Sequence, residues 1–296
     1  MQSESPDLPC NPERSFMSNR IQATFEKLHT KGEKALIPYI MAGDPTLAMT
    51  ESLVLALEQG GADLIELGVP FSDPIADGPV IQQAAERALR SGTTLKKILS
   101  TVTNLRKKTS IPLILMAYYN TIMAMGIEAF CAQAVQAGVD GLIVPDLPPE
   151  ESDLLYHAAQ ATGGPVSIFL LAPTSTAERR RAVIQRSHGF IYYVSLTGIT
   201  GAKLTDLSQV RQSVLHLQRT SKKPVAVGFG IASAEQAREV GQFADGVIIG
   251  SALVRHICEH HSASTFLTDI QRMAQQWKAV LLPVTGTPSS TRRPKT

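Results

Sequence analysis

Short hydrophobic runs alternate with longer amphipathic segments along most of the chain. The runs are bounded by Gly, Pro and Asp, which is typical of buried strands. Most runs begin about 20 to 35 residues after the previous one, the length of a strand, a helix and their loops. The eight runs are 35–42, 63–69, 112–118, 141–144, 166–171, 190–196, 224–229 and 246–250.

The segments between the runs have apolar positions at helical spacing, for example in 52–59, 95–107, 128–137, 150–161 and 234–240. Eight such units with almost continuously apolar strands predict an α/β fold, a single (β/α)₈ TIM barrel. We expect one helix before the first strand and an extra helix near residues 78–90, where the interval is longer.

A doubly wound open sheet is the alternative fold. It is disfavoured because no GxGxxG follows the first run, where the chain reads Ala42-Gly43-Asp44-Pro45. Residues 18–282 are therefore expected to form the barrel. Residues 1–17 contain Pro and acidic residues but no apolar core, and 283–296 are rich in Pro, Thr, Ser and Arg. Both are expected to be disordered arms.

Composition limits the function classes. Hydrophobic residues make up 44% and charged residues 18% of the chain, and the net charge of +2 gives no support for nucleic-acid binding. Cys10, Cys131 and Cys258 lie far apart, which fits a reducing compartment. No apolar run approaches the roughly 20 residues of a membrane helix. We expect a cytoplasmic enzyme, with the plastid stroma as a less favoured location.

The segment 64–78 carries the chemistry. Glu66 lies inside an apolar strand, where a carboxylate is costly unless it is paired, protonated or catalytic. If its side chain points into the barrel, its pKa should be raised toward neutrality. Asp77 follows in a more solvated loop and should stay ionised, so the two carboxyl groups would form an acid/base pair. Asp73 is interpreted as structural.

Three glycine-containing turns follow the last three strands. They are Gly198-Ile199-Thr200-Gly201, Gly228-Phe229-Gly230 and Gly250-Ser251. Backbone N–H groups in such turns and at a helix start bind phosphate, and barrel enzymes often place that site after strands seven and eight. We expect Ser251 to cap a helix and to contact the phosphate.

Other barrel chemistries find little support. No Lys lies within a strand run, which disfavours a Schiff-base aldolase. His256 and His260 have i, i+4 spacing, but no further ligand is evident, so no metal site is predicted. A lyase reaction in this barrel would therefore need the substrate itself to accept the electrons of the breaking bond.

Several segments resemble the tryptophan synthase α subunit from about residue 20 to residue 282. They are 65–78, 38–45, 144–148, 193–201 and 228–231. The resemblance implies retro-aldol cleavage of indole-3-glycerol phosphate to indole and D-glyceraldehyde 3-phosphate, in tryptophan biosynthesis. Glu66 would move the protons, and Asp77 would bind the indole N–H.

The resemblance also implies the binding residues. The indole and glycerol parts would contact Tyr39, Met116, Tyr118 and Tyr193. The phosphate would meet Gly201, Phe229, Gly230, Gly250 and Ser251. Tyr39 stands where the family often has phenylalanine, and Leu196 where bacterial relatives commonly have arginine, beside a loop that closes on substrate.

No cofactor is expected in this chain. The implied partner is a β subunit that carries pyridoxal phosphate and consumes indole in an α₂β₂ tetramer, with loops 70–78 and 197–203 closing on substrate and contacting that partner. Three alternatives stay open: a free-standing indole-releasing lyase, another phosphate-binding barrel using Glu66 or Asp44, and a non-catalytic barrel subunit.

Overall fold

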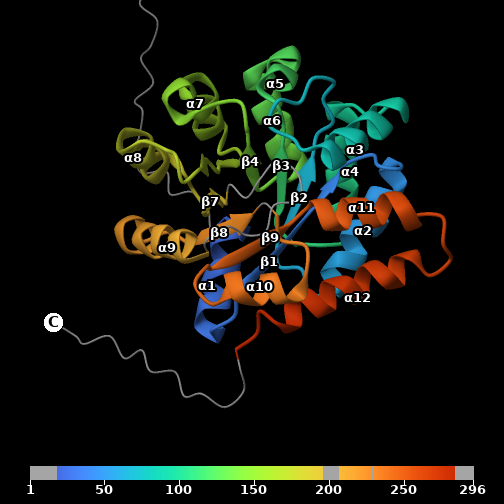
Figure 1. The fold of residues 1–296 in the computed structure, drawn as a ribbon. Helices are drawn as coiled ribbons and strands as arrows, with labels where there is room; N and C mark the ends of the chain where they lie inside the picture. The colour runs from blue at the N-terminus through green and yellow to red at the C-terminus, as the bar shows by residue number, and fades with distance from the viewer. Residues whose placement is uncertain (1–18, 196–206, 229, 284–296) are drawn as a thin grey trace, which may run out of the picture.

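The computed structural model describes residues 19–195, 207–228 and 230–283, and parallel strands form its centre. Figure 1 shows the helices arranged around these strands. The strands within the described residues are β1 (Ala35–Met41), β2 (Ile65–Gly68), β3 (Leu113–Met116), β4 (Gly141–Ile143), β5 (Val166–Ser167), β6 (Leu170–Leu171), β7 (Ile191–Val194), β8 (Val225–Gly228) and β9 (Gly246–Ile249).

The strands follow the order β5-β4-β3-β2-β1-β9-β8-β7-β6, and every pair is parallel. The two ends of this order, β5 and β6, are halves of the fifth predicted run. Between them Ile168 N donates to Leu142 O at 2.9 Å on one side, and Tyr192 N donates to Phe169 O at 3.3 Å on the other. The fifth run therefore pairs with both neighbours and closes the predicted barrel.

Helices cover the outside of the ring, and the expected extra helix is α3. In the described residues the helices are α1 (Arg20–Lys31), α2 (Leu47–Gln59), α3 (Pro79–Arg90), α4 (Leu95–Leu105), α5 (Tyr119–Met125), α6 (Ile127–Ala137), the 3₁₀ helix η1 (Pro149–Glu151), α7 (Asp153–Thr162), α8 (Ala177–Arg186), α9 (Leu207–Ser221), α10 (Ala234–Gly241), α11 (Ser251–His260) and α12 (Phe266–Ala279). No helix among these residues combines the length and apolar composition of a membrane span.

Alternate residues of each strand point to opposite sides, because side chains alternate with a period of two. Ile37, Ile114 and Tyr192 belong to the cluster inside the barrel. Leu36 and Tyr193 belong to the larger cluster between strands and helices. This alternation decides which side chains can meet a substrate.

Helix α1 closes the N-terminal end of the barrel. Its residues Ile21, Phe25 and Leu28 are buried in the interior cluster, and the Phe25 and Phe190 rings lie 5.6 Å apart. Asn19 caps the helix by accepting a hydrogen bond from Ile21 N at 2.8 Å. The helix predicted before the first strand is therefore the floor of the barrel.

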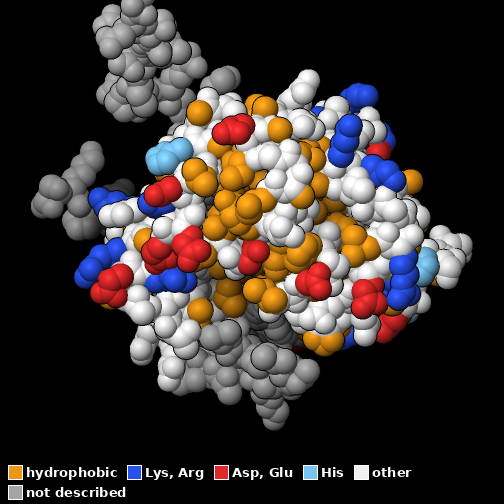
Figure 2. Space-filling model, turned by 90° about the horizontal axis from the view of Figure 1, so that it is seen from above, with side chains coloured by type: hydrophobic (Ala, Val, Ile, Leu, Met, Phe, Trp, Pro, Cys, Tyr) orange, Lys and Arg blue, Asp and Glu red, His pale blue; other side chains and the backbone are white. Residues whose placement is uncertain are grey.

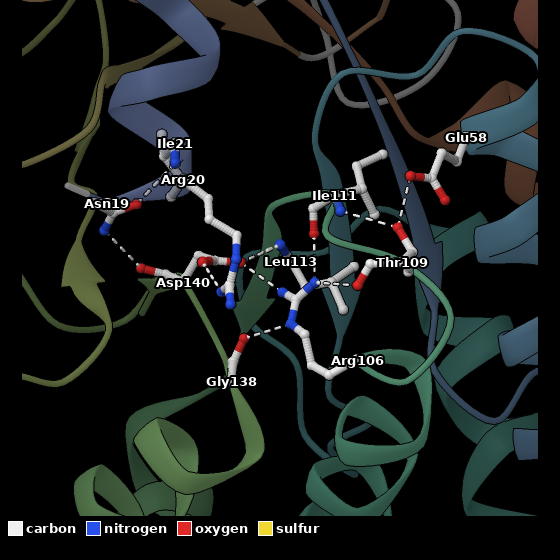
Figure 3. Close-up of polar contacts among 10 residues, drawn as sticks. All are labelled: Asn19, Arg20, Ile21, Glu58, Arg106, Thr109, Ile111, Leu113, Gly138 and Asp140. Atoms are coloured by element: carbon white, nitrogen blue, oxygen red, sulfur yellow. Dashed lines mark hydrogen bonds and ion pairs between the residues drawn. The ribbon is translucent and has the colours of Figure 1, made fainter. Parts of the chain in front are cut away.

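A buried carboxylate ties this floor to the strands (Figure 3). Asp140 accepts hydrogen bonds from Arg20 at 2.7 Å, from Arg106 at 2.6 Å and from Leu113 N at 2.8 Å. Arg106 also donates to the carbonyls of Gly138 and Ile111. Asp140 therefore links α1, α4 and the start of β3.

Most of the predicted arms, 1–17 and 283–296, lies outside the described residues, as do Gly201, Phe229, Leu196 and the loop 197–203. The division into a barrel and two arms stays a prediction.

Candidate active site

Glu66 is fully buried inside the barrel, near the middle of β2. It pairs in register with Tyr39 of β1 and Ile114 of β3. Both of its carboxyl oxygens lack a hydrogen-bond partner in the described part of the chain. Burial raises the pKa of Glu66 to about 8, from an ordinary value of 4.5. The carboxyl group is thus mostly protonated at neutral pH and available to a substrate.

This raised pKa predicts a pH-dependent stability. The folded protein holds a proton on Glu66 between about pH 4.5 and pH 8, whereas the unfolded chain has released it. The contribution of Glu66 is therefore favourable below pH 4.5 and is lost as the pH rises toward 8. We expect Glu66→Gln to unfold at a higher urea concentration than the wild type at pH 9, with the difference closing by pH 5. An equal difference at both pH values would contradict the raised pKa.

Asp77 lies in the loop between β2 and α3 and is half-buried. Its carboxylate accepts a hydrogen bond from the Tyr118 hydroxyl, which itself accepts one from Ala76 N at 3.0 Å. Burial raises the pKa of Asp77, and the bond from Tyr118 lowers it. Asp77 is therefore less solvated than expected from the sequence, and Tyr118 fixes its position.

Two tyrosines bring their hydroxyl groups to the interior. Tyr39 extends over Gly68, and Tyr192 extends over Gly228, where a Cβ would lie 2.5 Å from the Tyr192 hydroxyl oxygen. Burial raises the pKa of both phenols, and negative charge on Glu66 and Asp77 raises it further. Glycine at these two positions makes room for the rings beside Glu66.

The assignment of Tyr193 to this site is not supported by the geometry. Tyr193 is buried in the outer cluster between β7 and the helices, because it follows the inward-facing Tyr192 by one residue. Tyr192 is the residue that sequence reasoning missed. Met116, by contrast, faces inward as expected and packs against both the interior cluster and the cluster that contains Tyr39.

The backbone that follows β8 and β9 can bind an anion. Gly250 is the N-cap of α11, and no side chain caps this helix. The helix begins at Ser251 as predicted, but Ser251 is its first residue and not the cap, since Gly250 already adopts the non-helical cap conformation. Gly250 borders Tyr39, where an added Cβ would lie 3.5 Å from the Tyr39 Cβ. Gly230 follows β8 with a φ of 82°.

The other candidate groups, Asp44 and the pair His256 and His260, are engaged in other contacts. Asp44 is buried and receives two hydrogen bonds from Arg87, at 2.9 and 2.7 Å. It is therefore a structural anion that ties β1 to α3. The His256 and His260 rings stack 4.3 Å apart on α11. No cluster of three or more metal-ligating side chains occurs among the residues that the structure describes.

A family model described as tryptophan synthase alpha chain matches residues 25–281. The chain belongs to the tryptophan synthase alpha chain family.

Similar proteins of this family cover almost the same residues. The chain is 52% identical over 260 residues to the tryptophan synthase alpha chain of Geotalea daltonii, covering 88% of this chain and 98% of that protein. It is 48% identical to the one of Synechococcus sp. strain CC9902, covering 82% and 90%.

Solved structures of tryptophan synthase have the same fold as this chain. The alpha subunit from Legionella pneumophila str. Paris superposes with a TM-score of 0.82 at 42% identity, covering 89% of this chain and 98% of that one. A tryptophan synthase chain from M. tuberculosis gives 0.79 at 33% identity, covering 89% and 100%. Members of the tryptophan synthase alpha chain family are lyases of tryptophan biosynthesis, and this chain has that role.

Proposed function

We propose that Glu66 and Asp77 carry out the cleavage of indole-3-glycerol phosphate to indole and glyceraldehyde 3-phosphate. The observation that carries this assignment is the Glu66 carboxyl group: fully buried, without a hydrogen-bond partner in the described residues, and with a pKa of about 8. A group with this pKa both gives and takes a proton near neutral pH.

One carboxyl group is sufficient for the proton transfers. Glu66 in its acid form protonates C3 of the indole ring, which becomes an iminium-like electron acceptor. The resulting carboxylate then takes the proton of the glycerol hydroxyl next to the breaking bond. The C–C bond breaks, its electron pair returns to the ring, and Glu66 is again protonated.

Asp77 is proposed to stabilise the positive charge of the protonated ring by accepting a hydrogen bond from the indole N–H. Charge-assisted hydrogen bonds are stronger than neutral ones. Tyr39, Met116, Tyr118 and Tyr192 would border the indole ring. Gly230, Gly250 and Ser251 would bind the phosphate through N–H groups and the dipole of α11, with Gly201 and Phe229 completing the set predicted from the sequence.

This assignment of Asp77 gives a testable prediction. We expect Asp77→Asn to lower kcat/KM for indole formation by about 10- to 100-fold, because a neutral amide replaces the charged acceptor. The measurement is indole release from indole-3-glycerol phosphate by the purified chain. Glu86→Gln, an exposed carboxyl group on α3, is the matched control and should retain full activity. Unchanged kinetics of Asp77→Asn would remove Asp77 from the mechanism.

We further propose a β-subunit partner that carries pyridoxal phosphate and consumes the indole, in an α₂β₂ tetramer, and no cofactor on this chain. Figure 2 shows hydrophobic side chains gathered in the middle of one face with carboxylates around them. Ile75 of the loop 70–78 is 85% exposed and Met123 of α5 is 55% exposed. Exposed hydrophobic patches of this kind mark interaction sites. A cytoplasmic location likewise stays a prediction.

Measuring activity with and without the partner also distinguishes between the remaining alternative functions. Indole release should rise when a β subunit is added. A free-standing lyase would turn over as fast alone as with the partner. Substrate binding without turnover, even with the partner present, would support the non-catalytic barrel.

A further inference from the structure

A cavity lies outside the barrel, between α8 and α9. Figure 1 shows these two helices near one edge of the molecule. The cavity has a volume of about 270 Å³. It opens over the outward-facing side of β6 and β7, so the strands separate it from Glu66. It is lined by Leu171, Ala172, Pro173, Arg180, Tyr193, Gln212, Ser213, His216 and Leu217.

Tyr193 of β7 forms part of the wall of this cavity. Tyr193 is 2% exposed, and its hydroxyl oxygen has no hydrogen-bond partner within the described residues. This oxygen has almost no accessible surface, so a ligand would be recognised by the other groups that line the cavity.

The rim of the cavity carries a positive charge that pairs with no acidic side chain among the described residues. On the same helix, Arg179 pairs with Glu150 and Arg186 pairs with Asp153. Arg180 has no such ion pair in the part of the chain that the structure describes, and none of the described residues that line the cavity is acidic. His216 also lines the cavity and offers a ring nitrogen for a hydrogen bond.

We propose that this cavity binds a small aromatic monocarboxylate. Its carboxylate would pair with Arg180 beside His216, and its ring would contact Leu171, Pro173 and Leu217. The volume is below the range of about 300–1,000 Å³ that is typical of drug-sized ligands, so a single-ring ligand fits best. A neutral analogue would lose the contact with Arg180.

The test uses the full chain with 4-fluorobenzoate as the probe, followed by fluorine NMR. We expect a Kd of about 0.1–1 mM, given the affinity that so small a ligand can reach. Arg180→Gln should weaken binding at least about tenfold, since it removes a charged hydrogen bond. Ser213→Phe should abolish binding by filling the cavity. Arg181→Gln, an exposed arginine on the same helix, should leave the affinity unchanged.

Two further measurements separate this cavity from the barrel interior. The neutral probe 4-fluorobenzamide should bind at least about tenfold more weakly than the carboxylate. Indole formation by Arg180→Gln should equal that of the wild type, because Arg180 lies outside the barrel. Absence of probe binding at millimolar concentrations would overturn the proposal. Binding that survives both Arg180→Gln and Ser213→Phe would also overturn it, since the probe would then bind elsewhere.

Discussion

Glu66→Gln should lower the rate of indole formation by about 10²- to 10⁴-fold, the usual contribution of a general acid–base group. Glutamine keeps the shape of the side chain but neither donates a proton to C3 nor accepts one from the hydroxyl. The change should appear in kcat, measured as indole release at saturating substrate. KM should change little, because Glu66 acts on the reacting atoms and does not hold the phosphate.

Stability does not explain such a loss. The Glu66 carboxyl group is buried without a hydrogen-bond partner among the described residues, so replacing it by a neutral amide should preserve or raise the free energy of unfolding at neutral pH. Glu128→Gln, an exposed change on α6, serves as the control for preparation and assay. Wild-type turnover by Glu66→Gln would exclude Glu66 as the acid and leave the barrel without an evident proton donor.

The barrel and the position of Glu66 were both predictable from sequence. The repeat length of strand plus helix indicates the fold class, and the structure confirms the predicted barrel. Glu66 was identified because it is an ionisable residue in an apolar run. That signal depends on local composition alone, so no tertiary information was needed.

The choice between Tyr192 and Tyr193 was not predictable in this way. Strands of a parallel barrel are buried on both sides, so their inward and outward residues are equally apolar. A Tyr-Tyr pair then gives no sign of which ring faces the substrate. Only the register with the neighbouring strands, which pairs Tyr192 with Leu170 and Ala226, places Tyr192 inside.

Two smaller differences between the structure and the sequence prediction have identifiable causes. The fifth run divides into β5 and β6 because its first half pairs with β4 and its second half with β7. Helix α5 was not expected, since its seven residues are too few to show helical periodicity. The first feature depends on strands that are distant in sequence, and the second on the length of the helix alone.

The second large effect is expected from a substitution of Asp140 in the floor of the barrel. Asp140→Ala should lower the free energy of unfolding by about 3–5 kcal/mol, because it leaves a buried arginine without its counter-charge. The Arg106 side chain is 12% exposed, and burial already lowers its pKa while Asp140 raises it. The change also removes the acceptor for Leu113 N. Urea unfolding followed by circular dichroism measures the loss.

Asp153→Ala is the matched control, since Asp153 pairs with Arg186 at the surface and its side chain is 62% exposed. We expect it to cost less than about 1 kcal/mol. Equal losses for the two variants would show that Asp140 acts as an ordinary surface charge. Asp140 lies at the N-terminal end of the barrel, whereas Asp77 and Gly250 follow the C-terminal ends of strands. Below its unfolding transition, Asp140→Ala should therefore still release indole at the wild-type rate, which separates the residues that hold the barrel together from those that act on the substrate.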